Sequence, residues 1–430
     1  MEAKYFRDPI HGYIQVDHDI IYDLINSREF QRLRRIKQLG TSNCVFPGAE
    51  HTRFSHSLGA YHIARSIIER FEKSYADIWD SKNSLLTMVS ALLHDIGHGA
   101  YSHTFELLFD TDHEALTQSI ITSQNTEINS ILSRVSPDFP SQVASVIDHS
   151  HPNQQVIQLI SSQIDVDRMD YLLRDSYYTG TNYGNFELSH ILRVMQPKAN
   201  GICFSYQGMH AVEDYLLSRY QMYMQVYFHP ASRSMEVILQ NLLKRAKYLY
   251  PQQKNFFASN SPALIPFFEE KVNLTDYLKL DDGVLNTYFQ SWIFSDDDIL
   301  SDLADAFINR RLFKSFTYQE GQEGLIQELS KDIEAIGYDT NYYTGCHSNF
   351  NLPYDRYRPE TSHPQTQIDI LQKDGSLAEL SSLSPLIQSL SGGNYGDHRF
   401  YFPKDMLLED DLFQEAKGNF KSHIRNDQLI

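Results

Sequence analysis

Cysteine is scarce in this sequence. Among its 430 residues there are three cysteines, Cys44, Cys203 and Cys346, which lie far apart and are odd in number. They form neither a disulfide framework nor a Cys-x-x-Cys metal motif. The sequence therefore predicts a protein of a reducing, cytoplasmic compartment, whose length suffices to build a core without disulfide bonds.

Long apolar runs are also missing. No stretch reaches the roughly 18 consecutive apolar residues of a membrane span, and the first residues, MEAKYFRDPI, lack the apolar segment of a signal peptide. We therefore expect no membrane partner. The apolar fraction of 41% and the aromatic fraction of 13% indicate a folded globular chain. Its length predicts two or three folding units, or one large core with appendages.

Positive charge is in deficit. The 37 lysines and arginines face 55 aspartates and glutamates, which gives a formal net charge of -18. Polyphosphate backbones repel such a chain overall. The charge therefore argues against nonspecific binding of nucleic acid as the main function, whereas a local basic pocket for a small anion remains compatible with the composition.

The pattern of apolar residues predicts a mainly α fold. RDPIHGYIQVD near the N-terminus indicates a short hairpin, and helical periodicity then runs from Asp19 to about Tyr250 with a second hairpin at GICFSYQG. SLLTMVSALLHD is apolar on almost every side, which is typical of a buried helix. The long aromatic-rich run AVEDYLLSRYQMYMQVYF predicts another helix.

The segment 251–266, PQQKNFFASNSPALIP, predicts a domain boundary because it has proline at both ends. Beyond it, TQIDILQKDGSLAEL predicts a hairpin around Asp374-Gly375, and DHRFYFP predicts a strand. We therefore expect a helical core with short hairpins over residues 1–250 and a smaller α+β lobe over residues 251–430. The lobe is expected to serve regulation or oligomerisation.

A cluster of histidines and aspartates ends the buried helix. LLHDIGHGAYSH contains His94, Asp95 and His98, and His98 follows His94 by one helical turn. A buried carboxylate beside imidazoles needs compensation, which a divalent metal supplies. The alternative is a histidine-rich helix end held by hydrogen bonds alone.

Two further segments favour the metal. HTRFSHSLG carries His51, Arg53 and His56, and SQIDVDRMDYLLRD carries Asp165, Asp167 and Asp170. Imidazole and carboxylate donors suit Zn, Fe, Mn or Mg, and the sequence does not choose among them. Spacing alone leaves Asp165 in competition with Asp167.

The arrangement His56, His94-Asp95 and Asp167 resembles the HD-domain metal-dependent phosphohydrolases. QRLRRIKQLG, FPGAEHTRFSHSLG, LLHDIGHGAYSH, DHEA and IDVDRMDYLLRD occur in the order of the deoxynucleoside triphosphate triphosphohydrolase branch. The resemblance covers residues 4–250 strongly and is greatest to the bacterial homotetrameric members. It implies an HD-domain helical core and cleavage between the 5′ oxygen and the α-phosphorus, which releases a deoxynucleoside and intact triphosphate.

The resemblance assigns a role to each motif residue. His56, His94, Asp95 and Asp167 would hold a divalent metal ion, which would lower the pKa of a bound water and polarise a phosphate oxygen. The expected catalytic residues are His98, His103, His113, Glu114 and Arg53. His103 matches the histidine that protonates the leaving 5′ oxygen, and His98 is the rival for that role. Arg53 would neutralise charge on the phosphate.

Substrate contacts are expected from several other segments. Gln38 and Leu39 match residues that bracket the deoxyribose and disfavour a 2′-hydroxyl. Arg168, Tyr171 and Asp175 share one face of a predicted helix and match residues that contact phosphates and sugar. Arg168 stands where some relatives have lysine, so the phosphate geometry can differ. The resemblance further implies that Arg219 contacts phosphate and that Tyr227 packs on the sugar, with His229 two residues further on.

The basic run REFQRLRRIK contains Arg28, Arg32, Arg34, Arg35 and Lys37. It is read either as a solvated helix face or, through the resemblance, as part of an activator site between subunits. The candidates for binding an activating nucleotide such as dGTP or GTP are Lys4, Gln31, Arg34 and Arg311. Asn26 stands where some relatives have an aspartate that reads guanine, which leaves the activator's base open.

The sequence therefore predicts a metal-dependent dNTP triphosphohydrolase that forms a homo-oligomer, a tetramer by resemblance. Another HD-domain phosphohydrolase is the alternative: a nucleoside monophosphate phosphatase, a cyclic-nucleotide phosphodiesterase or an alarmone hydrolase. A nucleotide-sensing protein without turnover is the alternative from a different class.

Overall fold

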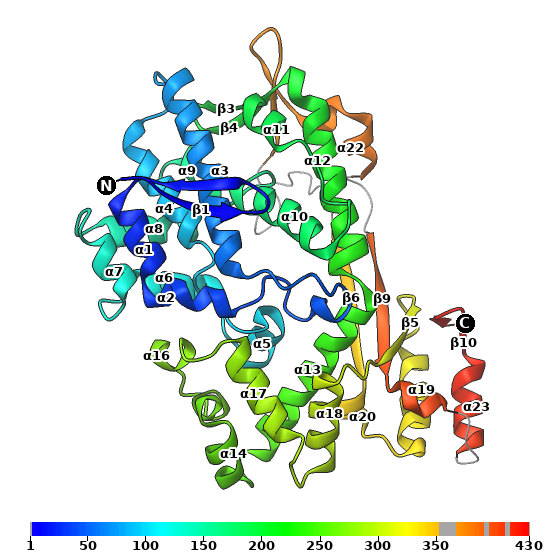
Figure 1. Cartoon of the computed structure of the whole chain (residues 1–430). Helices are drawn as coiled ribbons and strands as arrows, with labels where there is room; N and C mark the ends of the chain where they lie inside the picture. The colour runs from blue at the N-terminus through cyan, green and yellow to red at the C-terminus, as the bar shows by residue number, and fades with distance from the viewer. Residues whose placement is uncertain (1, 352–366, 391–394, 409–412, 430) are drawn as a thin grey trace.

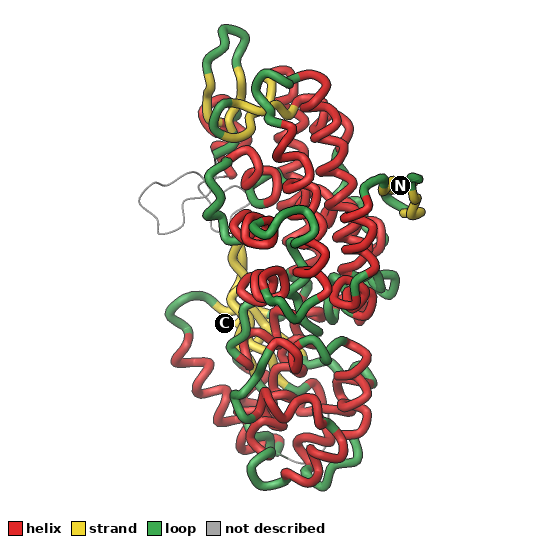
Figure 2. Tube along the Cα trace, turned by 90° about the vertical axis from the view of Figure 1, so that its left-hand side faces the viewer, coloured by secondary structure: helices red, strands yellow, loops and turns green. Residues whose placement is uncertain are grey.

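A computed structural model of the chain describes residues 2–351, 367–390, 395–408 and 413–429. It is predominantly helical with small sheets, as the sequence predicts (Figure 1). Turned by 90°, the molecule is elongated and helices fill both of its ends (Figure 2). The apolar residues of the described chain form three clusters, which organise the fold.

The first cluster is the core of the N-terminal helical bundle, and the antiparallel hairpin of β1 (Lys4–Asp8) and β2 (Gly12–Val16) packs on it. Its helices are α1 (Asp19–Asn26), α2 (Arg28–Arg32), α3 (Arg53–Ser74), α4 (Ser84–Leu93), α6 (His113–Thr122), α7 (Glu127–Leu132), α8 (Phe139–Ile147), α9 (Gln154–Ile160), α10 (Val166–Thr179), α11 (Leu188–Val194) and α12 (Met209–Met222). The short turns η1 (Leu33–Arg35) and η2 (Ser42–Cys44) lie in the stretch between α2 and α3. The buried helix that the sequence predicts is α4.

The second cluster is rich in aromatic rings, among them Phe257, Phe289 and Trp292. Its helices are α5 (Ser102–Phe109), α13 (Pro230–Leu249), α14 (Lys254–Asn260), α15 (Ile265–Phe268), α16 (Leu274–Tyr277), α17 (Asp282–Trp292), α18 (Asp298–Ile308) and α20 (Thr340–Tyr343). Ile96 belongs to the first cluster and Ala100 to the second, so the chain passes from one cluster to the other in the histidine-rich turn before α5.

The third cluster lies under a five-stranded sheet in the order β10-β11-β5-β9-β6. The strands are β5 (Lys314–Tyr318), β6 (Gly345–Asn351), β9 (Tyr395–Phe402), β10 (Ile424–Arg425) and β11 (Gln428–Leu429), and the helices are α19 (Glu323–Ile336) and α23 (Gln414–Ser422). The strand expected from DHRFYFP is the end of β9.

The hairpin expected around Asp374-Gly375 forms, with Gly375 at a φ of +86° that favours glycine. Its strands β7 (Asp369–Leu371) and β8 (Leu377–Glu379) extend the hairpin of β3 (Met195–Lys198) and β4 (Gly201–Ser205). The following helices are α21 (Leu380–Leu383) and α22 (Pro385–Leu390). Ile370, Leu380 and Ile387 belong to the first cluster, so this part of residues 251–430 packs on the N-terminal bundle. The division of the chain at residue 250 stays a prediction.

Two local expectations need correction. The helix that contains the histidine cluster ends at Leu93, and residues 94–97 form turns. The long aromatic helix is α12 followed by a π-helical turn, η5 (Tyr223–Tyr227). None of the helices in the described ranges has both the length and the apolar composition needed to cross a membrane.

Candidate metal centre and adjoining cavity

Four side chains from three segments converge at the end of α4. His56 comes from α3, His94 and Asp95 from the turn after α4, and Asp167 from the first turn of α10. His56 Nε2 lies 3.1 Å from Asp167 Oδ1 and 3.3 Å from His94 Nε2. His94 Nε2 lies 3.4 Å from Asp95 Oδ1. The structure thus brings together the four residues proposed as metal ligands.

Hydrogen bonds on the far side of both imidazoles determine which nitrogen points into the cluster. His56 Nδ1 lies 2.8 Å from Asp170 Oδ2, and His94 Nδ1 lies 2.8 Å from the Ala91 carbonyl oxygen. Both partners are acceptors, so each Nδ1 carries the proton. The two Nε2 atoms then face each other with lone pairs at 3.3 Å, an arrangement that needs a cation or a proton between them.

The carboxylates around the cluster favour positive charge there. Burial opposes protonation of His56, but hydrogen bonds with Asp167 and Asp170 outweigh it and raise the pKa of His56 to about 10. Burial would also raise the pKa of Asp95, yet the charges of His94, His98 and Arg53 hold it well below its usual range. A field that attracts a proton attracts a divalent cation, and two imidazoles with two carboxylates are donors that Zn, Fe and Mn accept. The donor set therefore fits a divalent metal.

Asp165 and Asp167 occupy different environments. Asp165 is the N-cap of α10, where it accepts from the Arg168 backbone N–H at 2.7 Å, and it also pairs with the Arg168 side chain. Asp167 instead faces His56 and His94. The geometry therefore favours Asp167 as the ligand, and capping accounts for Asp165.

A second cluster of titratable groups adjoins the first. The rings of His98 and His113 stack with their centroids 3.9 Å apart. Glu106 of α5 reaches both: Oε2 lies 3.2 Å from His113 Nδ1, and Oε1 lies 3.7 Å from His98 Nδ1. Asp95 Oδ1 is 3.4 Å from His98 Nε2, so Asp95 joins this cluster to the metal ligands.

Protonation differs between the two stacked rings. Burial and the charge of Arg53 lower the pKa of His98. Burial opposes protonation of His113 as well, but its hydrogen bond with Glu106 raises the pKa of His113. Burial would raise the pKa of Glu106, and hydrogen bonds from His113 and His98 outweigh it and lower that pKa to about 2. At neutral pH, the cluster holds an ionised carboxylate that contacts Nδ1 of two stacked imidazoles of unequal basicity.

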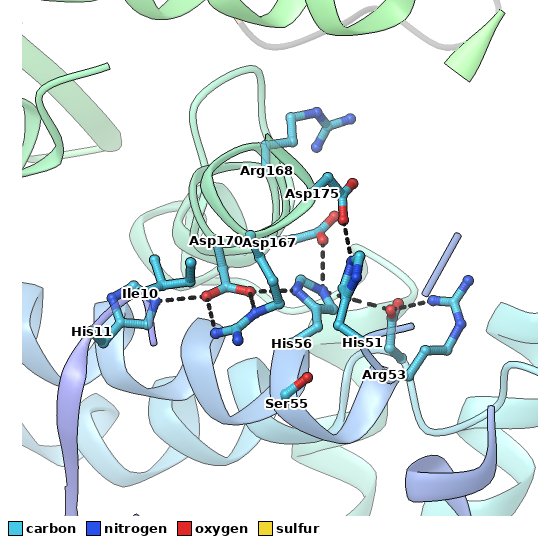
Figure 3. Close-up of polar contacts among 12 residues, drawn as sticks. Ile10, His11, His51, Arg53, Ser55, His56, Asp167, Arg168, Asp170 and Asp175 are labelled. Atoms are coloured by element: carbon cyan, nitrogen blue, oxygen red, sulfur yellow. Dashed lines mark hydrogen bonds and ion pairs between the residues drawn. The ribbon is translucent and has the colours of Figure 1, made fainter. Parts of the chain in front are cut away.

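A cavity of about 370 Å³ opens beside both clusters. The residues expected at the site that line it are Gln38, Leu39, Arg53, Asp95, His98, His113, Asp167, Tyr171, Asp175 and Tyr227. Arg53 Nη1 donates to Asp95 Oδ2 at 2.5 Å. Asp175 accepts from the Tyr227 hydroxyl at 2.7 Å and lies 2.7 Å from His51 Nε2, which fixes Tyr227 against the wall. Figure 3 shows His51, Arg53, His56 and Asp167 pointing toward a common region.

Three other expected site residues, Arg168, Arg219 and Glu114, are not part of the described cavity lining. Arg168 pairs with Asp165, and Arg219 is buried against Tyr223. Neither is among the described residues that line the cavity. Glu114 is exposed at the start of α6, so the carboxylate beside the stacked imidazoles is Glu106 instead. His103 lies in α5, and its side chain falls outside the described part of the structure.

Sequence reasoning missed Glu106, Arg233 and Glu236. Glu106 follows His103 by three positions, the spacing of one helix face, and this signal was available. Arg233 and Glu236 of α13 line the cavity and pair at 2.6 Å. They come from the second cluster of the fold, so no local motif connects them with the histidines.

The candidates for an activator site lie on separate elements of the chain. Lys4 is exposed on β1, while Arg34 donates to Gln31 Oε1 at 2.9 Å and lies 3.5 Å over the Phe54 ring. Arg311 pairs with Asp302 and Asp305. Acidic residues pair with most cations of the run 28–37, with Glu29 against Arg28, Asp281 against Arg35 and Glu50 against Lys37.

Comparison with known proteins agrees with this geometry. The HD domain matches residues 53–175, and an HD-associated region matches residues 186–406. Protein YwfO of Bacillus subtilis is 48% identical over 97% of this chain and 96% of its own length. A deoxynucleoside triphosphate triphosphohydrolase SAMHD1 homologue of Dictyostelium discoideum is 30% identical over 57% of this chain and 49% of its own length.

A solved structure is also similar. A phosphohydrolase from Bacteroides thetaiotaomicron superposes with a TM-score of 0.80 at 29% identity, over 93% of this chain and all of the other. The HD-associated region by itself spans more than half of the chain, and the B. subtilis relative extends over nearly all of it. The chain therefore belongs to the HD-domain phosphohydrolases, in the branch that includes the deoxynucleoside triphosphate triphosphohydrolases.

Proposed function

We propose that this protein hydrolyses deoxynucleoside triphosphates to a deoxynucleoside and inorganic triphosphate. The observation that carries the proposal is the position of the cavity: the proposed metal ligands Asp95 and Asp167 form part of its wall, together with Arg53. A divalent ion held there supplies a Lewis acid that activates water and polarises phosphate. The SAMHD1 relatives support the substrate class.

The chain's own groups account for the charge and proton transfers. Water adds to the α-phosphorus, the bond from that phosphorus to O5′ breaks, and a proton passes to O5′. Arg53 offers a permanent positive charge to the phosphate oxygens. The cluster of His98, His113 and Glu106 offers proton donors and acceptors, with Glu106 hydrogen-bonded to His113 at 3.2 Å and 3.7 Å from His98 Nδ1. His103 remains the alternative proton donor to O5′.

Other residues of the cavity lining suit a deoxyribose. They are Gln38, Leu39 and Tyr227, the last of which is fixed by Asp175. An apolar side chain packed near C2′ leaves an added hydroxyl without a hydrogen-bond partner, which disfavours ribonucleotides.

Product analysis tests the proposal. Protein loaded with Mn²⁺ is incubated with each dNTP and with the corresponding rNTP, alone and in pairs, and phosphorus NMR identifies the released species. We expect intact triphosphate from dNTPs and much slower release from rNTPs. Orthophosphate or pyrophosphate as the first product would instead support another HD-domain phosphohydrolase, and binding without turnover would support a nucleotide sensor.

We further propose that a second nucleotide such as dGTP or GTP activates the enzyme at Arg34, within a homotetramer. Arg34 is exposed and forms no ion pair with a carboxylate of the described residues. It stacks on Phe54, which is adjacent to Arg53 of the cavity. We expect Arg34→Ala to reduce the acceleration of dATP turnover by dGTP, whereas Arg28→Ala, which removes a paired surface arginine, serves as the matched control. If dGTP activates Arg34→Ala as strongly as it activates Arg28→Ala, Arg34 is a solvated surface residue without a role in activation.

A further inference from the structure

A completely buried carboxylate, Asp170, contacts the side of His56 that faces away from the metal centre. It accepts from His56 Nδ1 at 2.8 Å, from Arg174 Nε at 2.8 Å and Nη2 at 2.9 Å, and contacts His11 Nε2 at 2.6 Å. Asp170 lies between His11 and His56 in Figure 3. Its orientation, and through it that of the ligand His56, therefore depends on donors from more than one segment.

One of those donors comes from the N-terminal hairpin. His11 lies in the turn between β1 and β2, 159 positions away from Asp170 along the chain, and only 3% of its side chain is exposed. Burial of an imidazole in a hairpin turn is costly unless it forms a hydrogen bond. Its contact with Asp170 satisfies that requirement.

The same hairpin turn contacts Arg174. Asp8 Oδ1 accepts from the backbone N–H groups of Ile10 and His11 at 2.9 and 3.0 Å, which closes the turn. Asp8 Oδ2 accepts from Arg174 Nη1 at 2.7 Å. Arg174 is fully buried, so Asp8 and Asp170 together balance its charge. The two residues bonded within the turn, Asp8 and His11, thus also contact Arg174 and Asp170, respectively.

Close approach of α3 and α10 makes this contact possible. A Cβ atom at Gly59 would lie 1.8 Å from Asp170 Oδ1, so any other residue there would displace the carboxylate. Gly59 is one helical turn after His56. The two helices are therefore spaced so that Asp170 reaches His56 on one side and the hairpin on the other.

We infer that Asp8 and His11 are positioning residues of the metal centre, although they lie outside the HD domain at 53–175. They fix Asp170, and Asp170 fixes the ring and tautomer of His56 so that Nε2 presents its lone pair to the ion. The inference rests on the metal site of the proposed function and is independent of the substrate. The alternative is that the hairpin only packs, through Ile14 and Val16, on the bundle core.

Metal affinity of the full-length chain tests the inference. The variants are His11→Ala, which removes the donor, and His11→Gln, which restores an N–H donor at a similar distance. Tyr13→Ala is the matched control, because Tyr13 is on the same hairpin and 57% exposed. Mn²⁺ affinity is measured by competition with a chromophoric chelator, Co²⁺ absorption reports the coordination geometry, and thermal unfolding of the metal-free proteins reports the fold.

We expect His11→Ala to weaken Mn²⁺ binding about 10- to 100-fold and to change the Co²⁺ spectrum, while His11→Gln recovers most of the affinity and Tyr13→Ala equals wild type. If His11→Ala does not fold, Asp8→Asn replaces it, since the amide oxygen still closes the turn while the charge facing Arg174 is lost. Wild-type Mn²⁺ affinity in folded His11→Ala or Asp8→Asn would overturn the inference. Absence of Mn²⁺ binding by the wild type would instead overturn the metal-dependent function.

Discussion

Two clusters built from the same residue types adjoin each other in this protein and are arranged for different chemistry. In the metal cluster, His56 and His94 each direct Nδ1 away to a fixed acceptor, so both Nε2 atoms converge. In the second cluster, His98 and His113 stack and direct Nδ1 toward one shared carboxylate, Glu106. Nδ1 faces an acceptor in both clusters, so the clusters differ in the acceptors rather than in composition: two separate acceptors let the Nε2 atoms of the first pair converge, whereas one shared carboxylate holds the second pair.

Replacement of a proposed ligand should have the largest effect. We expect Asp167→Asn to lower Mn²⁺ affinity at least about 100-fold and to abolish turnover, because the charge of a partly buried ligand is lost. Metal content after dialysis, measured by mass spectrometry, checks the expectation. The helix-capping Asp165 provides the contrast: Asp165→Asn should retain metal, and loss of metal from that variant alone would reverse the assignment of the two aspartates.

Replacement of Glu106 should have a smaller and different effect. We expect Glu106→Gln to retain metal but to lower kcat about 10²-fold, within the range of general acid–base catalysis. Loss of the carboxylate removes the interaction that raises the pKa of His113, so any limb of the pH profile that reports His113 should move to lower pH. Metal content and kcat from pH 5 to 9 are the measurements. Glu114→Gln, at an exposed position, is the control. A loss of metal from Glu106→Gln would instead indicate that the two clusters form one metal site.

Removal of the ion should distinguish the clusters by stability. A ligand at 100 times its Kd stabilises the folded state by about 2.7 kcal/mol, so chelation should lower Tm by several degrees. We expect this shift in wild type and in Glu106→Gln but not in Asp167→Asn, as recorded by scanning calorimetry with and without EDTA. An equal shift in all three proteins would mean that the stabilising ion binds elsewhere.

The outline of this site could be predicted from sequence because its parts are local patterns. These patterns are the apolar helix that ends at Leu93, the run around His56 and the first turn of α10, and each can be recognised within about ten residues. Asp165 could also have been separated from Asp167, since aspartate is a preferred residue at the N-cap, the position directly before the first helical residue.

The remaining features depend on pairings across the chain. The family resemblance predicts Glu114 beside His113 at the site, yet adjacent helical side chains diverge by about 100°, and Glu106 from α5 is the carboxylate that contacts His113. The pairing of β7 with β4 and the contribution of Arg233 and Glu236 likewise join segments far apart in sequence. No local periodicity encodes such contacts.

The contact between Asp8 and Arg174 has a consequence for the order of folding. The two residues are 166 positions apart, and an isolated two-stranded hairpin is marginally stable at best. The hairpin is synthesised before α10, but it gains its buried partners only after α10 has been made and has packed on α3. Because contacts of such long range form late, a site that depends on them cannot recruit its ion to nucleate the bundle. Metal capture would then mark the completion of folding rather than its beginning.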